Sequence, residues 1–277
     1  MDLLTSDVRH AESPRWTEDR LWFSDQYGHA VRTLGLDGRL ETVASIPNRP
    51  SGLGRLPDGR WLLITADDGK LNWLEPGRVT ETVDLAPLIV GRAGDMVVDG
   101  RGWAYISDTG FDYDDPERRL GQVLLFTEEG GVRVVATGTN YANGSAVSAD
   151  GSRFFLAESF GERITVFDID DDGSLSNRRV FAELGTVPDG LCLDAAGGVW
   201  VALAFKRELA HVNVDGVVDD RLPVRGAMAI ACALGGPDRR TLFACSVDST
   251  PSDLSRGILD GGVIESTVVE VPGAGWP

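Results

Sequence analysis

Short segments that alternate hydrophobic and polar residues recur along the whole chain, and many of them are followed by a tight turn. The clearest turns are Asp58-Gly59, Asp99-Gly100 and Asp150-Gly151, each of which precedes a run rich in aliphatic and aromatic side chains. Asp-Gly supplies the positive φ angles that a tight hairpin requires, and the residues after it suit a packed strand. Because no segment shows a sustained helical period, the pattern predicts an all-β protein.

This turn-and-strand unit occurs six times. The copies begin near Ser13, Leu56, Val98, Ser148, Leu193 and Gly235. Their spacing of roughly 40 to 48 residues is the period of four-stranded propeller blades. We therefore predict a six-bladed β-propeller that forms a single domain over residues 1–277. The Val- and Thr-rich stretch from Val263 to Val271 is expected to be a strand pair. The segment before Glu12 is expected to pair with this last blade and hide its edge.

Charge and composition exclude several classes of partner. The net charge is −17 and the pI is about 4.5, so the protein is expected to bind neither nucleic acid nor anionic membranes. No apolar run reaches the ~20 residues that span a bilayer, and the first residues lack a basic region followed by an apolar stretch. We expect a cytoplasmic protein. Its three cysteines, Cys192, Cys232 and Cys245, stand in apolar runs and are expected to be plain buried thiols.

Polar residues at the start of three blades carry the candidate chemistry. Glu12, Asn143 and Asp189 stand at equivalent positions upstream of their blades' turns. Two carboxylates and an amide oxygen are hard ligands, so we predict one divalent metal ion in the central channel. Ca²⁺ is favoured, and Mg²⁺, Mn²⁺ or Zn²⁺ would also be accepted. The alternative is that Asn143-Gly144 and Asp189-Gly190 are only turns, but their register with Glu12 argues against it.

The sequence resembles the regucalcin/gluconolactonase family, which also includes luciferin-regenerating enzyme. The resemblance spans nearly the whole chain, and its main segments are Glu12-Ser13-Pro14-Arg15-Trp16, residues 91–99, Asn143-Gly144 and residues 188–194. It implies a six-bladed propeller, metal ligands at Glu12, Asn143 and Asp189, and hydrolysis of lactones or related cyclic esters. It also implies that Asp189 serves both as ligand and as general base.

The chain departs from this family in its third blade. The family sequence Arg-x-Asn-Asp is here Arg92-Ala93-Gly94-Asp95, so glycine replaces an asparagine that contacts ligand or metal-bound water in the family. We expect either a substrate that is bulkier and less polar than a sugar lactone or weaker catalysis. Arg92 is a candidate for orienting the substrate, with a simple rim ion pair as its alternative. Asp95 is a candidate catalytic or supporting carboxylate, with strand capping as its alternative.

Other chemistries fit the sequence less well. There is no G-x-S-x-G nucleophile elbow, and the histidines stand away from the starts of the blades, with His10 as the possible exception. The acidic, aromatic segment 109–121 is either a lid over the channel or a solvated loop. The favoured function is a divalent-metal-dependent hydrolase acting on a lactone or cyclic ester. The alternatives are a metal-templated ring-opening or cyclisation enzyme acting on a natural product, and a non-catalytic metal- or ligand-binding propeller.

Overall fold

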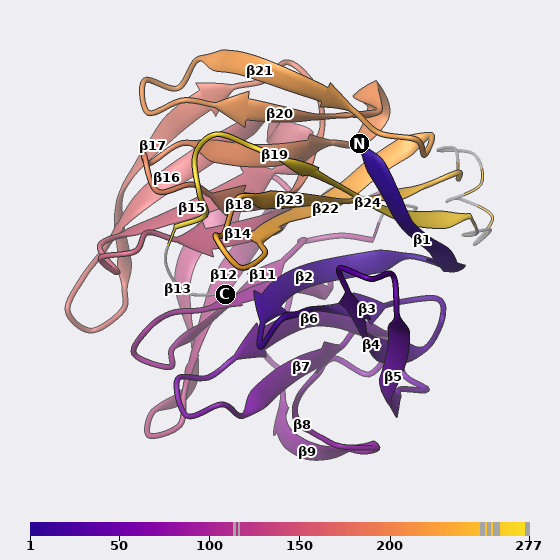
Figure 1. Cartoon of the computed structure of the whole chain (residues 1–277). Helices are drawn as coiled ribbons and strands as arrows, with labels where there is room; N and C mark the ends of the chain where they lie inside the picture. Colours follow the sequence, from indigo (N-terminus) through magenta and orange to yellow (C-terminus); the bar gives the residue numbers. More distant parts are fainter. Residues whose placement is uncertain (113–114, 116, 250–252, 254–255, 257–260, 275–277) are drawn as a thin grey trace.

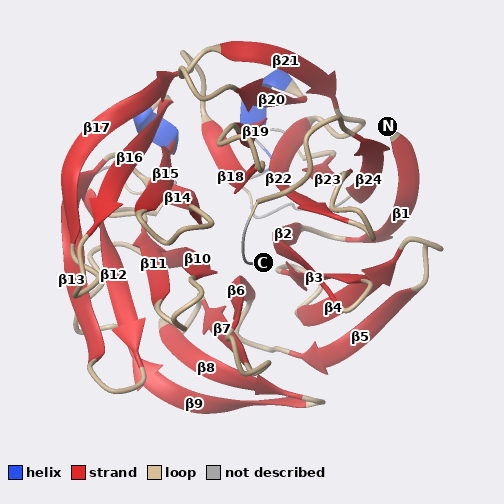
Figure 2. Cartoon of the chain, turned by 60° about the vertical axis from the view of Figure 1, so that its left-hand side comes forward, coloured by secondary structure: helices blue, strands red, loops and turns tan. Residues whose placement is uncertain are grey.

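Six four-stranded antiparallel sheets surround a central axis in the computed structural model (Figures 1 and 2). The structure describes residues 1–112, 115, 117–249, 253, 256 and 261–274. Figure 2 shows the first strand of each blade nearest the centre and the fourth at the periphery. The all-β, six-bladed propeller predicted from the repeat is therefore confirmed.

Five blades follow the chain in simple order. Blade one holds β2 (Ala11–Thr17), β3 (Arg20–Asp25), β4 (Ala30–Gly35) and β5 (Leu40–Ser45), and blade two holds β6 (Pro50–Arg55), β7 (Trp61–Thr65), β8 (Lys70–Glu75) and β9 (Arg78–Asp84). Blade three holds β10 (Ala93–Val98), β11 (Ala104–Asp108), β12 (Gly121–Thr127) and β13 (Gly131–Thr139), and blade four holds β14 (Ala142–Val147), β15 (Arg153–Glu158), β16 (Arg163–Ile169) and β17 (Leu175–Glu183). Blade five holds β18 (Pro188–Leu193), β19 (Val199–Leu203), β20 (Glu208–Val212) and β21 (Val218–Pro223). Two 3-10 turns, η1 (Ser159–Gly161) and η2 (Ala204–Lys206), follow β15 and β19.

The sixth blade joins the two ends of the chain. It consists of β22 (Met228–Gly235), β23 (Thr241–Val247), β24 (Gly262–Val268) and the N-terminal strand β1 (Asp2–Val8), which pairs antiparallel with β24. The predicted pairing of the N-terminal segment with the last blade is confirmed, and it covers the edge that β24 would otherwise expose. The strand pair expected over Val263 to Val271 is wrong, because one strand, β24, ends at Val268 and its partners are β23 and β1.

The hydrophobic core is divided among the spaces between blades. Each pair of neighbouring blades in the described part of the chain shares one cluster of buried aliphatic and aromatic side chains. Between blades one and two, for example, Trp22 stacks on Trp61 with ring centroids 4.5 Å apart. The cluster between blades six and one includes Phe23 and Phe243, so the ring is closed by packing as well as by β1. Burial of this apolar surface is the main force that holds the ring together.

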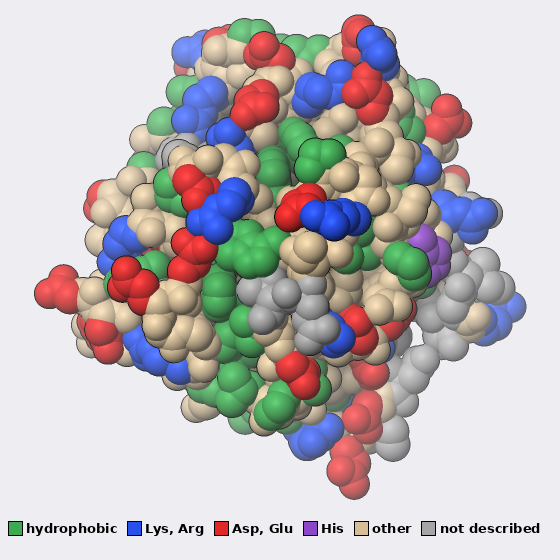
Figure 3. Space-filling model, turned by 90° about the horizontal axis from the view of Figure 1, so that it is seen from below, with side chains coloured by type: hydrophobic (Ala, Val, Ile, Leu, Met, Phe, Trp, Pro, Cys, Tyr) green, Lys and Arg blue, Asp and Glu red, His purple; other side chains and the backbone are tan. Residues whose placement is uncertain are grey.

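One face of the molecule is mixed in charge despite the acidic composition of the chain. Acidic and basic side chains are interspersed across the face seen in Figure 3, and hydrophobic side chains gather towards its centre. The acidic segment from Asp168 to Gly173 runs from the end of β16 into the hairpin turn before β17. Within the described residues, the structure contains no helix with the length and apolarity needed to cross a membrane.

Candidate metal and active site

The inner strands bring one position from each blade to the same end of the channel. The second residues of β2, β6, β10, β14, β18 and β22 are Glu12, Ser51, Gly94, Asn143, Asp189 and Ala229. In all six strands the pairing with the next strand shifts by a bulge just beyond this position. Since a bulge bends a strand and re-aims its side chains, the repeated bulges give this end of the channel its sixfold arrangement.

Glycines beside two candidate ligands are required by close packing of the inner strands. A Cβ atom on Gly144 would lie 2.5 Å from the carbonyl oxygen of Asp189, and one on Gly190 would lie 2.6 Å from the Cβ of Ala231. Neither Asn143-Gly144 nor Asp189-Gly190 is a turn, because both pairs lie inside strands. The glycines therefore let adjacent blades approach at the site.

This packing leads to a prediction for Gly144→Ala. The added methyl group meets backbone that cannot move aside as a flexible side chain would, so we expect a loss of about 1–3 kcal/mol in unfolding free energy. Urea denaturation of the purified variant measures it. Gly100→Ala is the matched control, because a Cβ there meets no heavy atom within 4 Å. Equal losses for both variants would contradict the proposed close approach.

Asn143 is anchored between two blades. Its amide nitrogen donates to the hydroxyl of Ser159 (3.1 Å), which in turn donates to the carbonyl oxygen of Pro188 (2.8 Å). The hydroxyl of Ser107 donates to the carbonyl oxygen of Asn143 (2.7 Å). Asn143 also hydrogen-bonds to the side chain of Asp189. The amide is thus oriented through its nitrogen, which leaves its oxygen as an available ligand.

Partly buried carboxylates gather beside this amide. Burial, followed by repulsion from Asp95, raises the pKa of Glu12 to about 8. Burial and then repulsion from Glu12 and Asp95 raise the pKa of Asp189 well above its usual value. Mutual repulsion between carboxylates is strong where little water surrounds them. It is relieved either when one of them takes up a proton or when a cation binds between them.

Asp95 lies in the floor of the same cavity, where other groups already engage its oxygens. The hydroxyl of Ser13 and the backbone N–H of Ser145 donate to it, the latter at 3.2 Å. Arg15, which is buried, places Nη2 3.5 Å from Asp95 and donates from the same atom to the carbonyl oxygen of Met96 (2.6 Å). These contacts suit a supporting carboxylate that links three inner strands.

His10 is a site residue that the sequence pattern did not select. Its Nε2 lies 3.2 Å from Oε1 of Glu12, and the ring lines the cavity. Burial lowers the pKa of His10 to about 4, so the ring is neutral near pH 7 and can donate to the carboxylate from Nε2. The only signal in the sequence was its position two residues before Glu12. His211 lies elsewhere, between Asp194 and Asp219. Glu158 is buried and forms ion pairs with Arg163 and Arg178, whose side chains are partly exposed.

A cavity of about 550 Å³ opens above these residues. Arg92 lines its rim and forms an ion pair with Asp112, with Nε and Oδ1 2.7 Å apart. The rim ion pair considered for Arg92 is therefore present. Of the segment proposed as a lid, Thr109 and Asp112 line the cavity. Phe111 is buried, whereas Tyr113 and Asp114 lie outside the described residues.

The walls of the cavity differ in polarity around the ring. Blades one to three contribute mainly polar side chains, among them Gln26, Tyr27, Arg49, Ser51 and Arg92. Apart from the candidate ligands and Ser159, blades four to six contribute mainly apolar and aromatic ones, namely Tyr141, Phe160, Val187, Ala204, Phe205, Met228 and Ile230. The cavity can therefore hold a ligand with one polar and one apolar side.

Gly94 leaves open space in the polar wall. A Cβ atom there would have the carbonyl oxygen of Ser107 and Cγ2 of Thr109 as its nearest neighbours, both 3.9 Å away. These are ordinary van der Waals distances, so the surroundings leave room for a Cβ atom at this position. Crowding therefore does not require a glycine here.

The donor chemistry of the site fits a hard divalent cation. Glu12 and Asp189 offer carboxylate oxygens and Asn143 an amide oxygen, and all three line the same cavity. Among the residues that the structure describes, no three His, Cys, Asp or Glu side chains form a cluster that could hold a metal. The candidate set contains only two such residues and relies on the amide for its third ligand.

Comparison with known proteins places these features in context. The family described as "SMP-30/Gluconolactonase/LRE-like region" matches residues 10–248. An L-arabinolactonase of Azospirillum brasilense is 29% identical over 94% of this chain and 89% of that protein. Human regucalcin is 28% identical over 98% of this chain and 95% of its own. The crystal structure of a calcium-binding regucalcin from Agrobacterium tumefaciens superposes with a TM-score of 0.83 at 21% identity, covering 99% of this chain and 95% of that one.

Proposed function

Since the chain belongs to the SMP-30/gluconolactonase/LRE-like family, we propose that it is a divalent-metal-dependent hydrolase of a lactone or related cyclic ester. The observation that carries the proposal is the convergence of Glu12, Asn143 and Asp189 at the base of one cavity. Relatives named as lactonases, such as the arabinolactonase, support the reaction class. The calcium-binding regucalcin supports Ca²⁺ as the cation to test first.

Glu12, Asn143 and Asp189 would hold the cation. A bound divalent cation polarises an ester carbonyl and stabilises the negative charge that develops on its oxygen. The chain's own groups complete the reaction. The Asp189 carboxylate accepts the proton of the water molecule that attacks the carbonyl carbon. The ring C–O bond then breaks, Asp189 returns the proton to the departing oxygen, and the product is an open-chain hydroxy acid.

The remaining polar residues act around this centre. His10 donates a hydrogen bond to Glu12 and fixes its orientation. Asp95 supports Ser13 and Arg15 and keeps negative charge near the ligands. Arg92 orients a polar group of the substrate from the rim, where its ion pair with Asp112 fixes its position.

A lactone panel tests the proposed reaction directly. Purified protein is treated with EDTA and then assayed with Ca²⁺, Mg²⁺, Mn²⁺ or Zn²⁺ against sugar lactones and lactones bearing alkyl or aryl groups. Hydrolysis that disappears with EDTA and returns with one of these cations is expected. Cation binding without hydrolysis of any cyclic ester would instead support a binding propeller.

The substrate is proposed to carry an apolar substituent. Val187, Met228 and Ile230 from blades five and six face the cavity, and Phe205 remains 39% exposed. An alkyl or aryl group placed against this wall would be removed from water, which contributes about 25 cal/mol for each Å² buried. We therefore expect higher kcat/KM for such lactones than for polyhydroxylated ones.

Gly94→Asn is predicted to shift this preference towards sugar lactones. The Cβ atom of the new side chain would have its nearest neighbours 3.9 Å away, and the amide adds a donor and an acceptor to the polar wall. One added hydrogen bond is worth about 1 kcal/mol, so kcat/KM for a sugar lactone is expected to rise roughly fivefold to tenfold. Gly94→Ala is the control, because it fills space without adding an amide. An equal change in both variants, or none, would assign specificity to other residues.

A further inference from the structure

Two cysteines from neighbouring blades meet in the structure. Sγ of Cys192, on β18, lies 3.7 Å from Sγ of Cys232, on β22. The Cys232 thiol also lies 3.3 Å from the carbonyl oxygen of Trp200. The residues are 40 positions apart in sequence, so only the packing of blade five against blade six brings them together. The expectation of three plain buried thiols is wrong for Cys192, which is partly exposed.

The backbones that carry these sulfurs approach unusually closely. Gly190 stands two residues before Cys192, and a Cβ on it would lie 2.6 Å from Cβ of Ala231, the residue before Cys232. A disulfide has an S–S bond of about 2.05 Å. The sulfurs must therefore approach by roughly 1.7 Å from their present separation of 3.7 Å. Side-chain rotation can supply a movement of this size while the strands stay in place.

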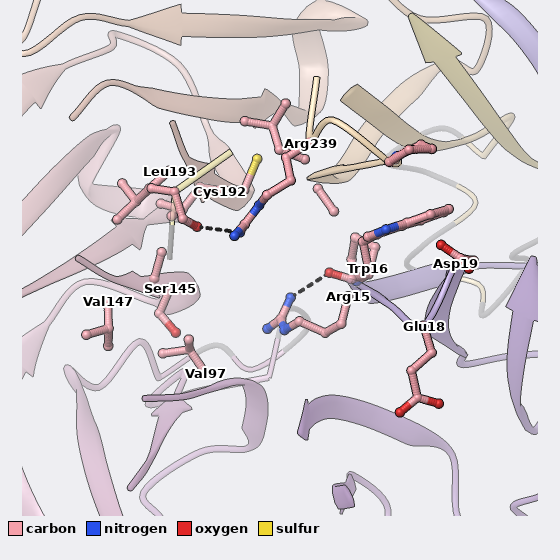
Figure 4. A pocket seen from close by; sticks show the side chains of 18 residues that line it. Arg15, Trp16, Glu18, Asp19, Val97, Ser145, Val147, Cys192, Leu193 and Arg239 are labelled. Carbon is pink, nitrogen blue, oxygen red and sulfur yellow. Dashed lines mark hydrogen bonds between the residues drawn. The ribbon is translucent and has the colours of Figure 1, made fainter. Parts of the chain in front are cut away.

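The pair differs from the candidate active site in position and in access. Glu12, Asn143 and Asp189 stand near the starts of their inner strands, whereas Cys192 stands one residue before the end of β18. Cys192 lines a second cavity of about 340 Å³ with residues from the ends of the inner strands, including Arg15, Val97 and Val147 (Figure 4). This cavity is large enough to admit a small oxidant. Cys232 is buried, and burial raises the pKa of its thiol. Cys192 is the more accessible of the two, so its sulfur meets the oxidant first.

We propose that Cys192 and Cys232 form a reversible disulfide that joins blades five and six, with hydrogen peroxide as the oxidant. The Cys192 sulfur attacks the peroxide, the O–O bond breaks, and one oxygen leaves as water while Cys192 becomes a sulfenic acid. The Cys232 sulfur then attacks the Cys192 sulfur and displaces the hydroxyl group as a second water molecule. The two thiols supply the two electrons that reduce the peroxide. A small dithiol reverses the reaction by thiol–disulfide exchange.

Thiol counting and peptide mapping test the proposal on the full chain. The reduced protein has three free thiols, and after treatment with hydrogen peroxide we expect one. Trypsin cleaves after Lys and Arg and so places the three cysteines in separate peptides, 180–206, 226–239 and 241–256. A cross-link between the first two peptides, removed by dithiothreitol, is the expected product. Three remaining thiols, oxidation of Cys192 without a cross-link, or a cross-link that includes the third peptide would overturn it.

Variants separate this pair from the third cysteine. Cys245→Ser is the matched control, because Cys245 is buried in blade six and is not needed for the proposed bond. It is expected to lose both of its remaining thiols on oxidation. Cys192→Ser, at the less buried position, is expected to keep both of its thiols. If Cys192→Ser lost two thiols as readily as the wild-type chain, the assignment would be wrong.

Thermal unfolding gives a second measurement. A disulfide between residues 40 positions apart restricts the unfolded chain, so we expect the oxidised protein to melt about 5 °C or more above the reduced one. The same treatment of Cys192→Ser should leave Tm unchanged. A lower Tm after oxidation of the wild-type protein would show that the bond strains the blades and would contradict the proposed fit.

Discussion

Replacing Asp189 by Ala is expected to abolish both lactone hydrolysis and high-affinity cation binding. The side chain is partly buried beside Glu12 and Asn143, and we assign it two roles, ligand and proton acceptor. Loss of a general base alone lowers the rate by about 10² to 10⁴, and loss of a ligand adds to this. Steady-state kinetics and calorimetric titration with Ca²⁺ measure the two effects separately.

The control for this variant is Asp168→Ala, which removes a carboxylate from an exposed hairpin far along the blade. It is expected to bind the cation and turn over substrate as the wild-type protein does. Wild-type cation affinity in Asp189→Ala would show that the three-ligand site is wrong. In that case Asp95 and Glu12, which lie in the same cavity, would become the carboxylate ligands to test next.

The metal-free protein is predicted to lose stability as the pH rises above 6.5. The pKa of Glu12 is about 8 in the folded protein against 4.5 for the free group, so the folded state retains a proton that the unfolded state has released. The stability that this proton contributes is fully present below the pKa of Glu12 in the unfolded state. It is lost as the pH rises through the pKa of Glu12 in the folded state. Between about pH 6.5 and pH 8 the loss amounts to about 2 kcal/mol for Glu12. Asp189, whose pKa is also raised, acts in the same direction.

Calorimetric melting from about pH 6.5 to pH 9, in EDTA and in saturating Ca²⁺, measures this effect. The lower limit keeps most of the His10 contribution out of the result, because the pKa of His10 falls from 6.5 to about 4 on folding. Calcium should remove most of the loss, since it binds the deprotonated carboxylates. Glu12→Gln should make the profile in EDTA shallower, and the loss that remains is expected from Asp189. A wild-type profile already flat in EDTA would contradict the repulsion between these groups.

The sequence alone determined the repeat and, through it, much of the architecture. Asp-Gly turns followed by apolar runs specify hairpins locally, and six copies at a blade-like spacing specify a ring. The same repeat placed Glu12, Asn143 and Asp189 at equivalent positions, because residues at the same position of a repeated strand occupy equivalent places in their blades. The pairing of the N-terminal segment with the last blade followed from the need to cover an edge.

Only the tertiary structure decided which side chains meet at the site and across blades. His10 has no distinctive spacing in the sequence, and only the structure shows that its Nε2 lies 3.2 Å from Oε1 of Glu12. The motif in the third blade identified Asp95 only as a candidate carboxylate. Its contacts in the structure are with Ser13 and Arg15 from blade one. Cys192 and Cys232 are separated by a whole blade in sequence and become neighbours through the close approach at Gly190. Local pattern encodes strands and turns, whereas distances across blades depend on packing, which no single repeat contains.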